Sequence, residues 1–262
     1  MTLRLSPSAI HAWRNCPAEY WRKYLSADRW PDHRSYFAQG SVVHKMAEIA
    51  LKNQTRARNA GEVRKDPLLW VTDAIFTREW NYHAGKVTDW KGVNLDKARE
   101  HTYHAARAIV AHVGNWDVEG MEEKFEVPIA EGVVMPGVID IRGKRRIVDI
   151  KTHDSKETPY TARYAAEQFQ PSAYALGAWH ATGVLPKEFQ YLSVSMKPPY
   201  TVVPSEVIHL TPFHAMRAVA TALIVARAVK QMEFPTRWNG GCKSCPFASR
   251  GGCIPEVKEV AA

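Results

Sequence analysis

Apolar positions in the N-terminal part of the chain recur every three to four residues, which is the spacing of a helix face. Ser6 and Pro7 form an N-cap and a first-turn pair for a helix. Pro17 cannot continue that helix, so the pattern predicts two helices that meet at Cys16. Further helices are predicted over residues 39–52 and over residues 66–113, with a polar break at residues 83–94.

The pattern changes near Glu122, where short apolar runs bounded by turn residues predict strands. Strands are predicted over residues 123–130, 133–142, 145–152, 188–196 and 201–210. A helix is predicted over 162–183, ending at Gly183, and a closing helix begins at Thr211 and Pro212. The tail from Phe234 is rich in Gly, Pro and Cys and is predicted to be irregular. This order predicts a mixed α/β fold with a helical N-terminal region.

Two neighbouring predicted strands carry carboxylates where their apolar runs end, at Asp140 and Asp149. Two carboxylates held close together repel, and a hard divalent cation such as Mg²⁺ or Mn²⁺ relieves that repulsion. Lys151 shares the strand face of Asp149, because side chains alternate with period two. Ile150 faces the core, and its backbone carbonyl is available as a further metal ligand. The alternative is a salt bridge between Asp149 and Lys151 on a solvated face, so the rest of the sequence must decide.

The composition fits one sizeable domain of 262 residues. No stretch is apolar and long enough to span a membrane, and the first residues lack the apolar region of a secretory signal. These features favour a cytoplasmic protein over a membrane or secreted one. The formal net charge of +8 favours a polyanionic partner such as nucleic acid, although such a surplus also serves solubility.

The four cysteines lie at opposite ends of the chain, at Cys16, Cys242, Cys245 and Cys253. In a secreted chain they could form two disulfide bonds. In a reducing compartment a C-x-x-C pair with further cysteines favours a metal site instead. Ligand type alone leaves a structural Zn²⁺ and an iron–sulfur cluster as alternatives.

Six segments carry a recognisable order of motifs: "SPSAIHAWRNCPAEYWRKY", "GSVVHKMAE", "GVIDIR", "IVDIKT", "QFQPSAYAL" and "CKSCPFASRGGC". Together they resemble the RecB-like branch of the PD-(D/E)XK nuclease superfamily. The third and fourth resemble its G-x-[IV]-D and D-x-K-T strands, with Asp140, Asp149 and Lys151 as the catalytic set. One departure is that isoleucine precedes Asp140 where the superfamily name has proline. The aspartate, which is the ligand, is retained.

The resemblance implies roles for three more side chains. His44, in the G-x-x-x-H helix, is expected to ligate the metal together with Asp140, Asp149 and the Ile150 carbonyl. Gln170 and Tyr174, in the Q-x-x-x-Y helix, are expected to guide the DNA strand. Glu126 aligns loosely with an acidic position of the first strand, and Glu122 and Glu123 compete for that position.

The resemblance also implies a restriction-endonuclease-like α/β core with a helical N-terminal region and a C-terminal Cys-rich, cluster-binding tail. The expected division is a helical region over 1–120, a catalytic core over 121–233 and an iron–sulfur tail over 234–262. The set of Cys16, Cys242, Cys245 and Cys253 is expected to bind a 4Fe–4S cluster, with zinc as the alternative.

Among families of this branch, the chain is most similar to the CRISPR-associated four-type proteins, some of them phage or archaeal. That likeness implies a Mg²⁺- or Mn²⁺-dependent exonuclease that prefers single-stranded DNA ends, and it allows an oligomer. The alternative is a DNA-binding subunit of a recombination, repair or CRISPR-adaptation complex in which cleavage is secondary or endonucleolytic. The sequence assigns no protein partners.

Overall fold

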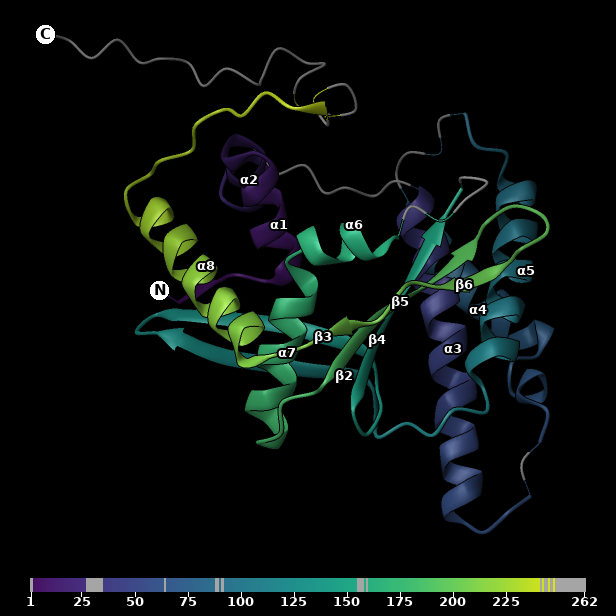
Figure 1. Cartoon of the computed structure of the whole chain (residues 1–262). Coiled ribbons are helices and arrows are strands. Elements are labelled where there is room, and N and C mark those ends of the chain that lie inside the picture. The colour runs from purple at the N-terminus through teal and green to yellow at the C-terminus, as the bar shows by residue number, and fades with distance from the viewer. Residues whose placement is uncertain are drawn as a thin grey trace, which may run out of the picture.

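The computed structural model describes residues 2–26, 35–63, 65–87, 90, 92–154, 158, 160–240, 242, 245 and 247. A mixed sheet runs through the middle of the molecule, with helices against both of its faces (Figure 1). The strands are β1 (Leu3–Arg4), β2 (Gly120–Ala130), β3 (Val133–Arg142), β4 (Arg146–His153), β5 (Glu188–Ser195), β6 (Val202–Pro204) and β7 (Ile208–His209).

The sheet order is β1-β3-β4-β5-β6, with β2 also paired to β3 and β7 also paired to β5. The hairpins β2–β3 and β3–β4 are antiparallel, whereas β4 and β5 are parallel. A parallel pair needs a long crossover, and here helices α6 (Ala162–Glu167) and α7 (Gln170–Thr182) provide it. The mixed sheet and its helices form the α/β core expected from the sequence.

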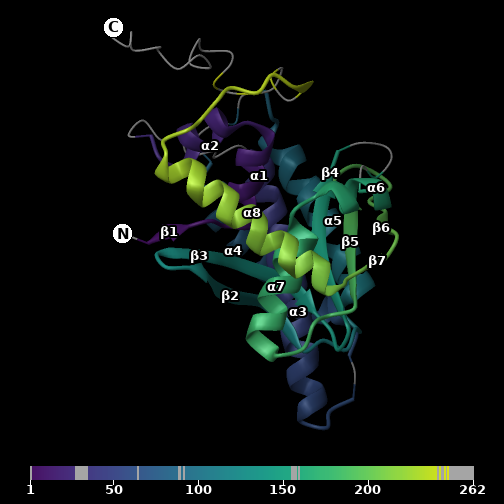
Figure 2. The ribbon, with the colours of Figure 1, turned by 60° about the vertical axis from the view of Figure 1, so that its left-hand side comes forward.

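One face of the sheet is covered by α1 (Pro7–Asn15), α7 and α8 (Pro212–Lys230), and α2 (Pro17–Tyr24) follows α1. Figure 2 shows α8 lying across the molecule on the same side as α7. The core on this side joins Ile139 and Ile147 of the sheet to Ile10, Ala173 and Val225 of the helices. Its burial removes apolar surface from water, which is the main stabilising contribution to such a core.

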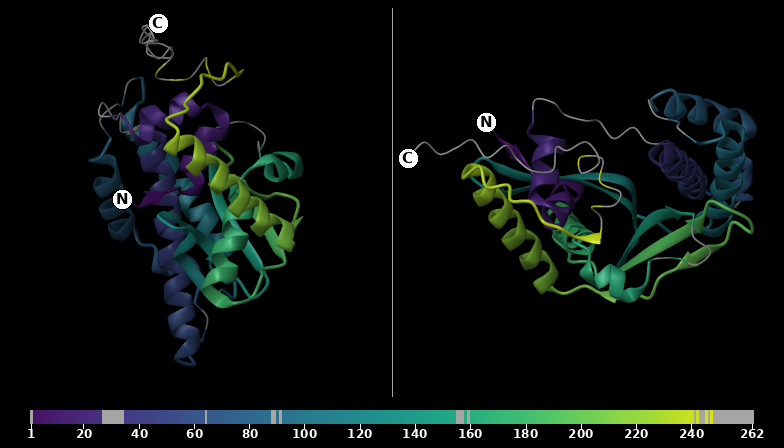
Figure 3. Two further views of the ribbon diagram at one scale, coloured as in Figure 1. Left: turned by 90° about the vertical axis from the view of Figure 1, so that its left-hand side faces the viewer. Right: turned by 90° about the horizontal axis from the view of Figure 1, so that it is seen from above.

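The other face is covered by a helical layer that contains α3 (Ser35–Asn59), the short helix η1 (Pro67–Trp70), α4 (Asp73–Ala84) and α5 (Leu95–Val113). In Figure 3 these helices stand opposite α7 and α8 across the sheet. Val148, Ile150 and Leu192 of the strands pack there against Val42 and Ile109. Ile150 is therefore a core residue, as expected, while its neighbours Asp149 and Lys151 face the opposite side.

The helix predicted over 162–183 is interrupted at Gln168 and Phe169. Pro171 explains the break, because it has no N–H and its ring would clash with the carbonyl of Glu167, four residues earlier. The strand predicted over 201–210 is likewise two short strands, β6 and β7. Pro204 cannot donate to the ladder, and Ser205 contacts Tyr191 through its backbone and side chain instead.

Helix α7 lies very close to the sheet because two glycines leave room for the ring of Phe125. A Cβ at Gly137 would lie 2.2 Å from that ring, and a Cβ at Gly177 would lie 2.6 Å from it. The ring therefore fills the space between strand and helix, and it packs edge-on against Tyr174. This contact fixes the height of α7 above the sheet.

Within the described part of the chain, α8 is the helix that is long and apolar enough, by length and composition, to cross a membrane. Such a helix can equally be a core helix of a globular protein. Ala215, Ala218, Ala222, Val225 and Ala226 are all buried against the core beside α7. This packing accounts for one face of α8, whereas Phe213, Met216, Leu223 and Ile224 lie exposed on the rest of the helix.

Candidate active site

The carboxylates of Asp140 and Asp149 lie where strands β3 and β4 stop pairing. Their ladder joins Ile141 to Val148 and Arg142 to Ile147, and it ends just before Asp140 and Asp149. The N–H of Ile150 instead donates to Asp140 Oδ2 at 2.8 Å. The end of the ladder therefore directs a side-chain oxygen and a strand amide toward the same place.

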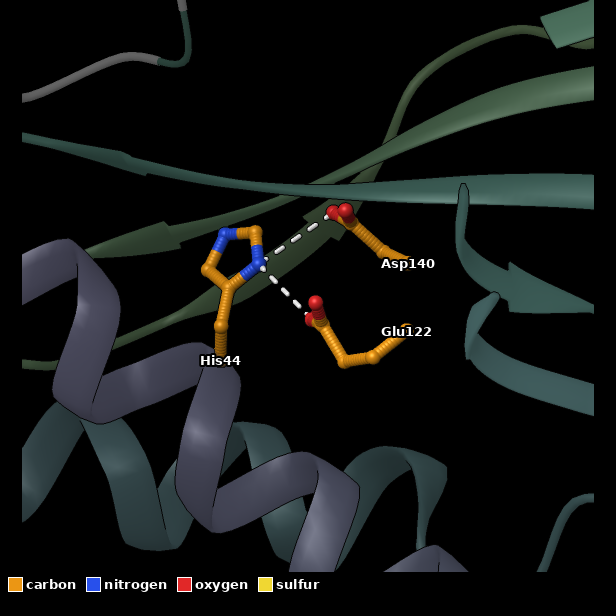
Figure 4. Close-up of side chains that lie close together, drawn as sticks. All are labelled: His44, Glu122 and Asp140. Atoms are coloured by element: carbon orange, nitrogen blue, oxygen red, sulfur yellow. Dashed lines mark ion pairs between the residues drawn. The ribbon is translucent and has the colours of Figure 1, made fainter. Parts of the chain in front are cut away.

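His44 extends from α3 toward this point (Figure 4). Its Nδ1 atom lies 3.3 Å from Asp140 Oδ2 and 3.8 Å from Glu122 Oε1. One ligand atom from each of His44, Glu122 and Asp140 lies within 4.8 Å of the other two. Imidazole nitrogen and carboxylate oxygen together suit Mn²⁺ or Mg²⁺, so the three side chains could hold a metal ion.

Glu122 reaches this group from an unusual backbone conformation. Its φ is +48°, in the left-handed region that non-glycine residues seldom adopt. Met121 and Glu123 pair with Ile141 and Ile139, so Glu122 lies opposite Asp140 across the β2–β3 ladder. Strain of this kind tends to occur at functional sites, where the surroundings hold it in place.

The charges at this site affect one another strongly. Burial disfavours a charged His44, but the carboxylates of Asp140, Glu122 and Asp149 outweigh it and raise the pKa of His44 to about 9. Burial and the nearby Asp149 carboxylate raise the pKa of Asp140. Burial opposes the charge on Lys151 as well, yet Asp149 and Asp140 keep the pKa of Lys151 above its ordinary value. A buried site in which carboxylates lie this close together favours a bound cation.

Asp149 is almost fully buried and is held from two sides. Lys151 Nζ lies 2.6 Å from its Oδ2 atom, as the shared strand face predicted. Gln170 Nε2 donates to its Oδ1 atom at 2.5 Å. The same nitrogen lies 2.8 Å from the Tyr174 hydroxyl, and the Tyr191 hydroxyl donates to Gln170 Oε1 at 3.5 Å. Tyr174 is only 5% exposed, so it contacts Gln170 from within the core.

Two cavities adjoin these side chains. The first, of about 560 Å³, is lined by His44, Glu122, Ile150 and Lys151, among others. The second, of about 550 Å³, lies toward α1 and α2 and is lined in part by Gln170. Lys151 and Phe37 line both cavities. Phe37 and its neighbour Tyr36 are half-exposed, and their ring centroids are 4.3 Å apart.

The structure thus brings His44, Asp140, Asp149, Lys151, Gln170 and Tyr174 together. Of the three glutamates that competed for the acidic position, Glu122 lies at the site. Glu126 is paired with Arg4, and Glu123 is paired with Arg142, so neither belongs to this group. Tyr191, Tyr36 and Phe37 also lie beside these side chains, and the sequence does not predict this. Their only signal in the sequence is aromatic character, which core residues share.

The C-terminal segment runs back to the N-terminal helices (Figure 1). The N–H of Arg237 donates to Cys16 Sγ at 3.4 Å, and the N–H of Asn239 donates to Cys242 Sγ at 3.3 Å. Cys16, Cys242 and Cys245 are free cysteines, and their sulfur atoms do not form a group within 4.8 Å of one another. Cys253 lies outside the described residues.

A family model of the PD-(D/E)XK nuclease superfamily matches residues 4–250. No curated protein matched the chain by sequence.

Among solved structures, a protein of Eubacterium rectale with a provisional exonuclease name superposes with a TM-score of 0.58. It has 15% identity, and the match covers 97% of this chain and 90% of that one. The structure of SSO0001 has a TM-score of 0.39 and 16% identity, over 80% of this chain and 96% of that chain. At such identities the likeness concerns the fold alone. The family match over almost the whole chain shows that this protein belongs to the PD-(D/E)XK nuclease superfamily, the metal-dependent nucleases that hydrolyse DNA phosphodiester bonds.

Proposed function

We propose that this nuclease is an exonuclease that acts on single-stranded DNA ends. The observation that carries the proposal is the convergence of His44, Glu122 and Asp140 beside the Asp149–Lys151 pair. Cavities of about 560 and 550 Å³ flank that convergence and share Lys151. A strand can therefore approach the site from either side.

We assign the metal to His44, Glu122 and Asp140, with Asp149 and the Ile150 carbonyl as further ligands. The oxygen-rich donor set fits Mg²⁺ or Mn²⁺. A bound ion of this kind supplies Lewis-acid stabilisation of phosphoryl charge and a more acidic water. In this proposal Lys151 orients the attacking water and stabilises negative charge on the phosphate. Gln170 holds the carboxylate of Asp149 at a fixed orientation, and Tyr174 holds Gln170.

The preference for single strands rests on Phe37 and Tyr36. Unpaired bases expose faces that stack on aromatic rings, whereas bases in a duplex already stack on one another. Phe37 is 47% exposed and lies at the boundary of the two cavities, beside Lys151. A base of the strand that passes Lys151 can therefore stack on this ring.

The test uses 5′- and 3′-labelled single- and double-stranded DNA, linear and circular, with Mn²⁺, Mg²⁺ or EDTA. We expect stepwise shortening of linear single strands with either ion, little cleavage of circles and none in EDTA. Asp149→Asn protein, purified in the same way, controls for contaminating nuclease and should be inactive. Cleavage of circles as fast as linear strands would make the enzyme an endonuclease. Equal activity of Asp149→Asn would remove the site assignment.

We further propose that Cys16, Cys242, Cys245 and Cys253 ligate one 4Fe–4S cluster, with structural zinc as the alternative. Support comes from the hydrogen bonds that join residues 237–239 to two members of the set, Cys16 and Cys242. Thiolate ligation suits such a cluster. Anaerobically purified protein should be brown, with iron and acid-labile sulfide in equal amounts. Colourless protein with one zinc ion per chain would select zinc.

A further inference from the structure

A third cavity continues the line of the two that flank the active site. It has a volume of about 450 Å³ and shares His11 and Gln168 with the second cavity. The second cavity in turn shares Phe37 and Lys151 with the first. The three cavities therefore adjoin one another in series, from the His44 side chain to the C-terminal segment.

Three arginines from distant parts of the sequence meet at this third cavity. Arg14 and Arg237 line it, and Arg217 extends from α8 beside them. Both Nη atoms of Arg14 donate to the Glu167 carbonyl at 3.2 Å, and Arg217 Nη2 donates to the same oxygen at 3.3 Å. Arg237 Nη1 donates to the Arg14 carbonyl. The guanidinium groups of Arg14 and Arg217 are thus held together by one shared acceptor.

The shared acceptor exists because of the proline that interrupts the helix before α7. In a continuous helix the Glu167 carbonyl would accept from the N–H of residue 171, but residue 171 is proline and has none. The carbonyl is left at the end of α6 and accepts from the arginines instead. The break between α6 and α7 therefore builds the arginine cluster.

Two of these arginines, Arg14 and Arg237, have backbone acceptors for their guanidinium groups. Within the described part of the chain, the guanidinium groups of Arg14 and Arg237 contact backbone carbonyls and no carboxylate. The Glu167 side chain is engaged with Arg163. Burial, followed by the charges of Arg217 and Arg237, lowers the pKa of Arg14. Like charges held this close favour an anion, and arginine binds phosphate through two parallel hydrogen bonds.

We infer that Arg14, Arg217 and Arg237 form a second phosphate-binding site, which holds the substrate strand at a distance from the metal-binding site. The inference rests on the proposed action on single strands. A strand cleaved beside His44 would pass Phe37 and Lys151, continue past His11 and Gln168, and place a more remote phosphate among the three arginines. Short strands would not reach this site, and longer strands would gain affinity from it.

The test measures binding of labelled oligothymidylates of about 4 to 16 nucleotides, the range of site sizes in single-strand-binding folds. Binding is measured in EDTA by fluorescence anisotropy at several salt concentrations. Arg217→Ala is compared with Arg227→Ala, which removes the same charge from the exposed face of the same helix. Arg14→Ala and Arg14→Lys form a second pair, and the melting temperature of each variant establishes folding.

We expect Arg217→Ala and Arg14→Ala to bind long strands about tenfold more weakly, as expected for a lost charged hydrogen bond. The slope of log affinity against log salt should fall by about 0.7 for each lost phosphate contact. Arg14→Lys should recover only part of the loss, and binding of the shortest strands should not change. If the affinities of Arg217→Ala and Arg227→Ala depend on strand length and salt in the same way, the inference is overturned. The proposed function still holds in that case, provided that the wild type cleaves single strands. If the wild type neither binds nor cleaves single strands, the proposed function itself fails.

Discussion

At the scale of single residues, the site depends on a chain of contacts that begins in the core. Tyr174 is buried and contacts Gln170, and Gln170 donates to Asp149. Tyr191 supports Gln170 from β5. A hydrogen-bonded network of this kind fixes a carboxylate in one orientation, which a reaction needs at each turnover. We therefore propose that Tyr174 is a positioning residue.

Tyr174→Phe should lower kcat about two- to tenfold, the range expected for one lost hydrogen bond of about 0.5–1.5 kcal/mol. Affinity for single-stranded DNA should be nearly unchanged, because the lost hydroxyl is buried. Single-turnover cleavage and anisotropy measure the two quantities. Tyr20→Phe, at a buried tyrosine of the same core away from the site, is the control for general loosening. Weaker binding with normal cleavage of bound DNA would contradict this role.

Phe37→Ala should raise KM for single strands at least fivefold with little change in kcat, because one stacked base contributes about 1–3 kcal/mol. Phe37→Trp should restore most of the affinity, since indole also stacks. Phe213→Ala removes a more exposed phenylalanine on α8 and should have no effect. The stacking role fails if the Phe37 and Phe213 variants have the same KM.

The residues that could be predicted are those whose position follows from strand alternation. Asp149 and Lys151 had to share a face, and they do. The choice between Glu122 and Glu126 could not be made in this way, because both have the same parity along β2. The register with β3 decides it, since Glu122 lies opposite Asp140 and Glu126 pairs with Pro136. Register depends on contacts between strands, which a local pattern does not contain.

At the scale of elements, the helices and central strands could be predicted, and their ends and interruptions less well. Pro17 was correctly expected to separate two helices, whereas the same reasoning was not applied to Pro171. Strand β1 could not be predicted, because two residues are too few to show an alternating pattern. Its strand conformation comes from parallel pairing with Val133 and Val134. Short elements of this kind are stabilised by tertiary contacts more than by local propensity.

Gly177→Ala should destabilise the fold by about 1–3 kcal/mol, the usual range for overpacking. The added methyl would lie 2.6 Å from the ring of Phe125, which Gly137 confines on its other side. Displacement of α7 should also move Gln170 and lower cleavage. Gly40→Ala is the matched control in α3, where a Cβ has an ordinary contact of 3.5 Å to Thr152. It should instead gain about 0.5–1 kcal/mol from helix propensity. Urea unfolding of both variants tests the pair, and equal stabilities would contradict the packing argument.

At the scale of the whole molecule, residues 237–239 lie against the end of α1, next to the third cavity. Arg237 contacts Cys16 through its N–H and Arg14 through its side chain. Asn239 Nδ2 donates to the Asn15 carbonyl at 2.9 Å. The segment after α8 has few buried apolar residues, so these contacts and any ligated metal must supply its order.

Cys16→Ala should therefore increase amide hydrogen exchange in residues 234–240 and lower the melting temperature. Cys16→Ser separates the two possible causes, because serine can still accept from the Arg237 N–H but is a poor ligand for iron. If a cluster orders the segment, both variants should exchange faster than the wild type and contain less iron. Unchanged exchange and iron content in Cys16→Ala would refute the shared site.

The left-handed backbone conformation of Glu122 should affect which variants are selected when this protein is evolved for heat resistance. A non-glycine residue in such a conformation costs on the order of 1–3 kcal/mol, and its carboxylate lies next to Asp140, whose pKa is already raised. Glu122→Gly should thus melt at a higher temperature than the wild type in EDTA. With Mn²⁺ the order should reverse, because an ion that binds only the folded state stabilises it. A lower melting temperature of Glu122→Gly in EDTA would contradict the strain argument. Directed evolution for heat resistance in the absence of a divalent ion should therefore accumulate stable variants that have lost Glu122 and cleave DNA poorly. A screen for stable variants of this enzyme should be run with Mn²⁺ or Mg²⁺ present.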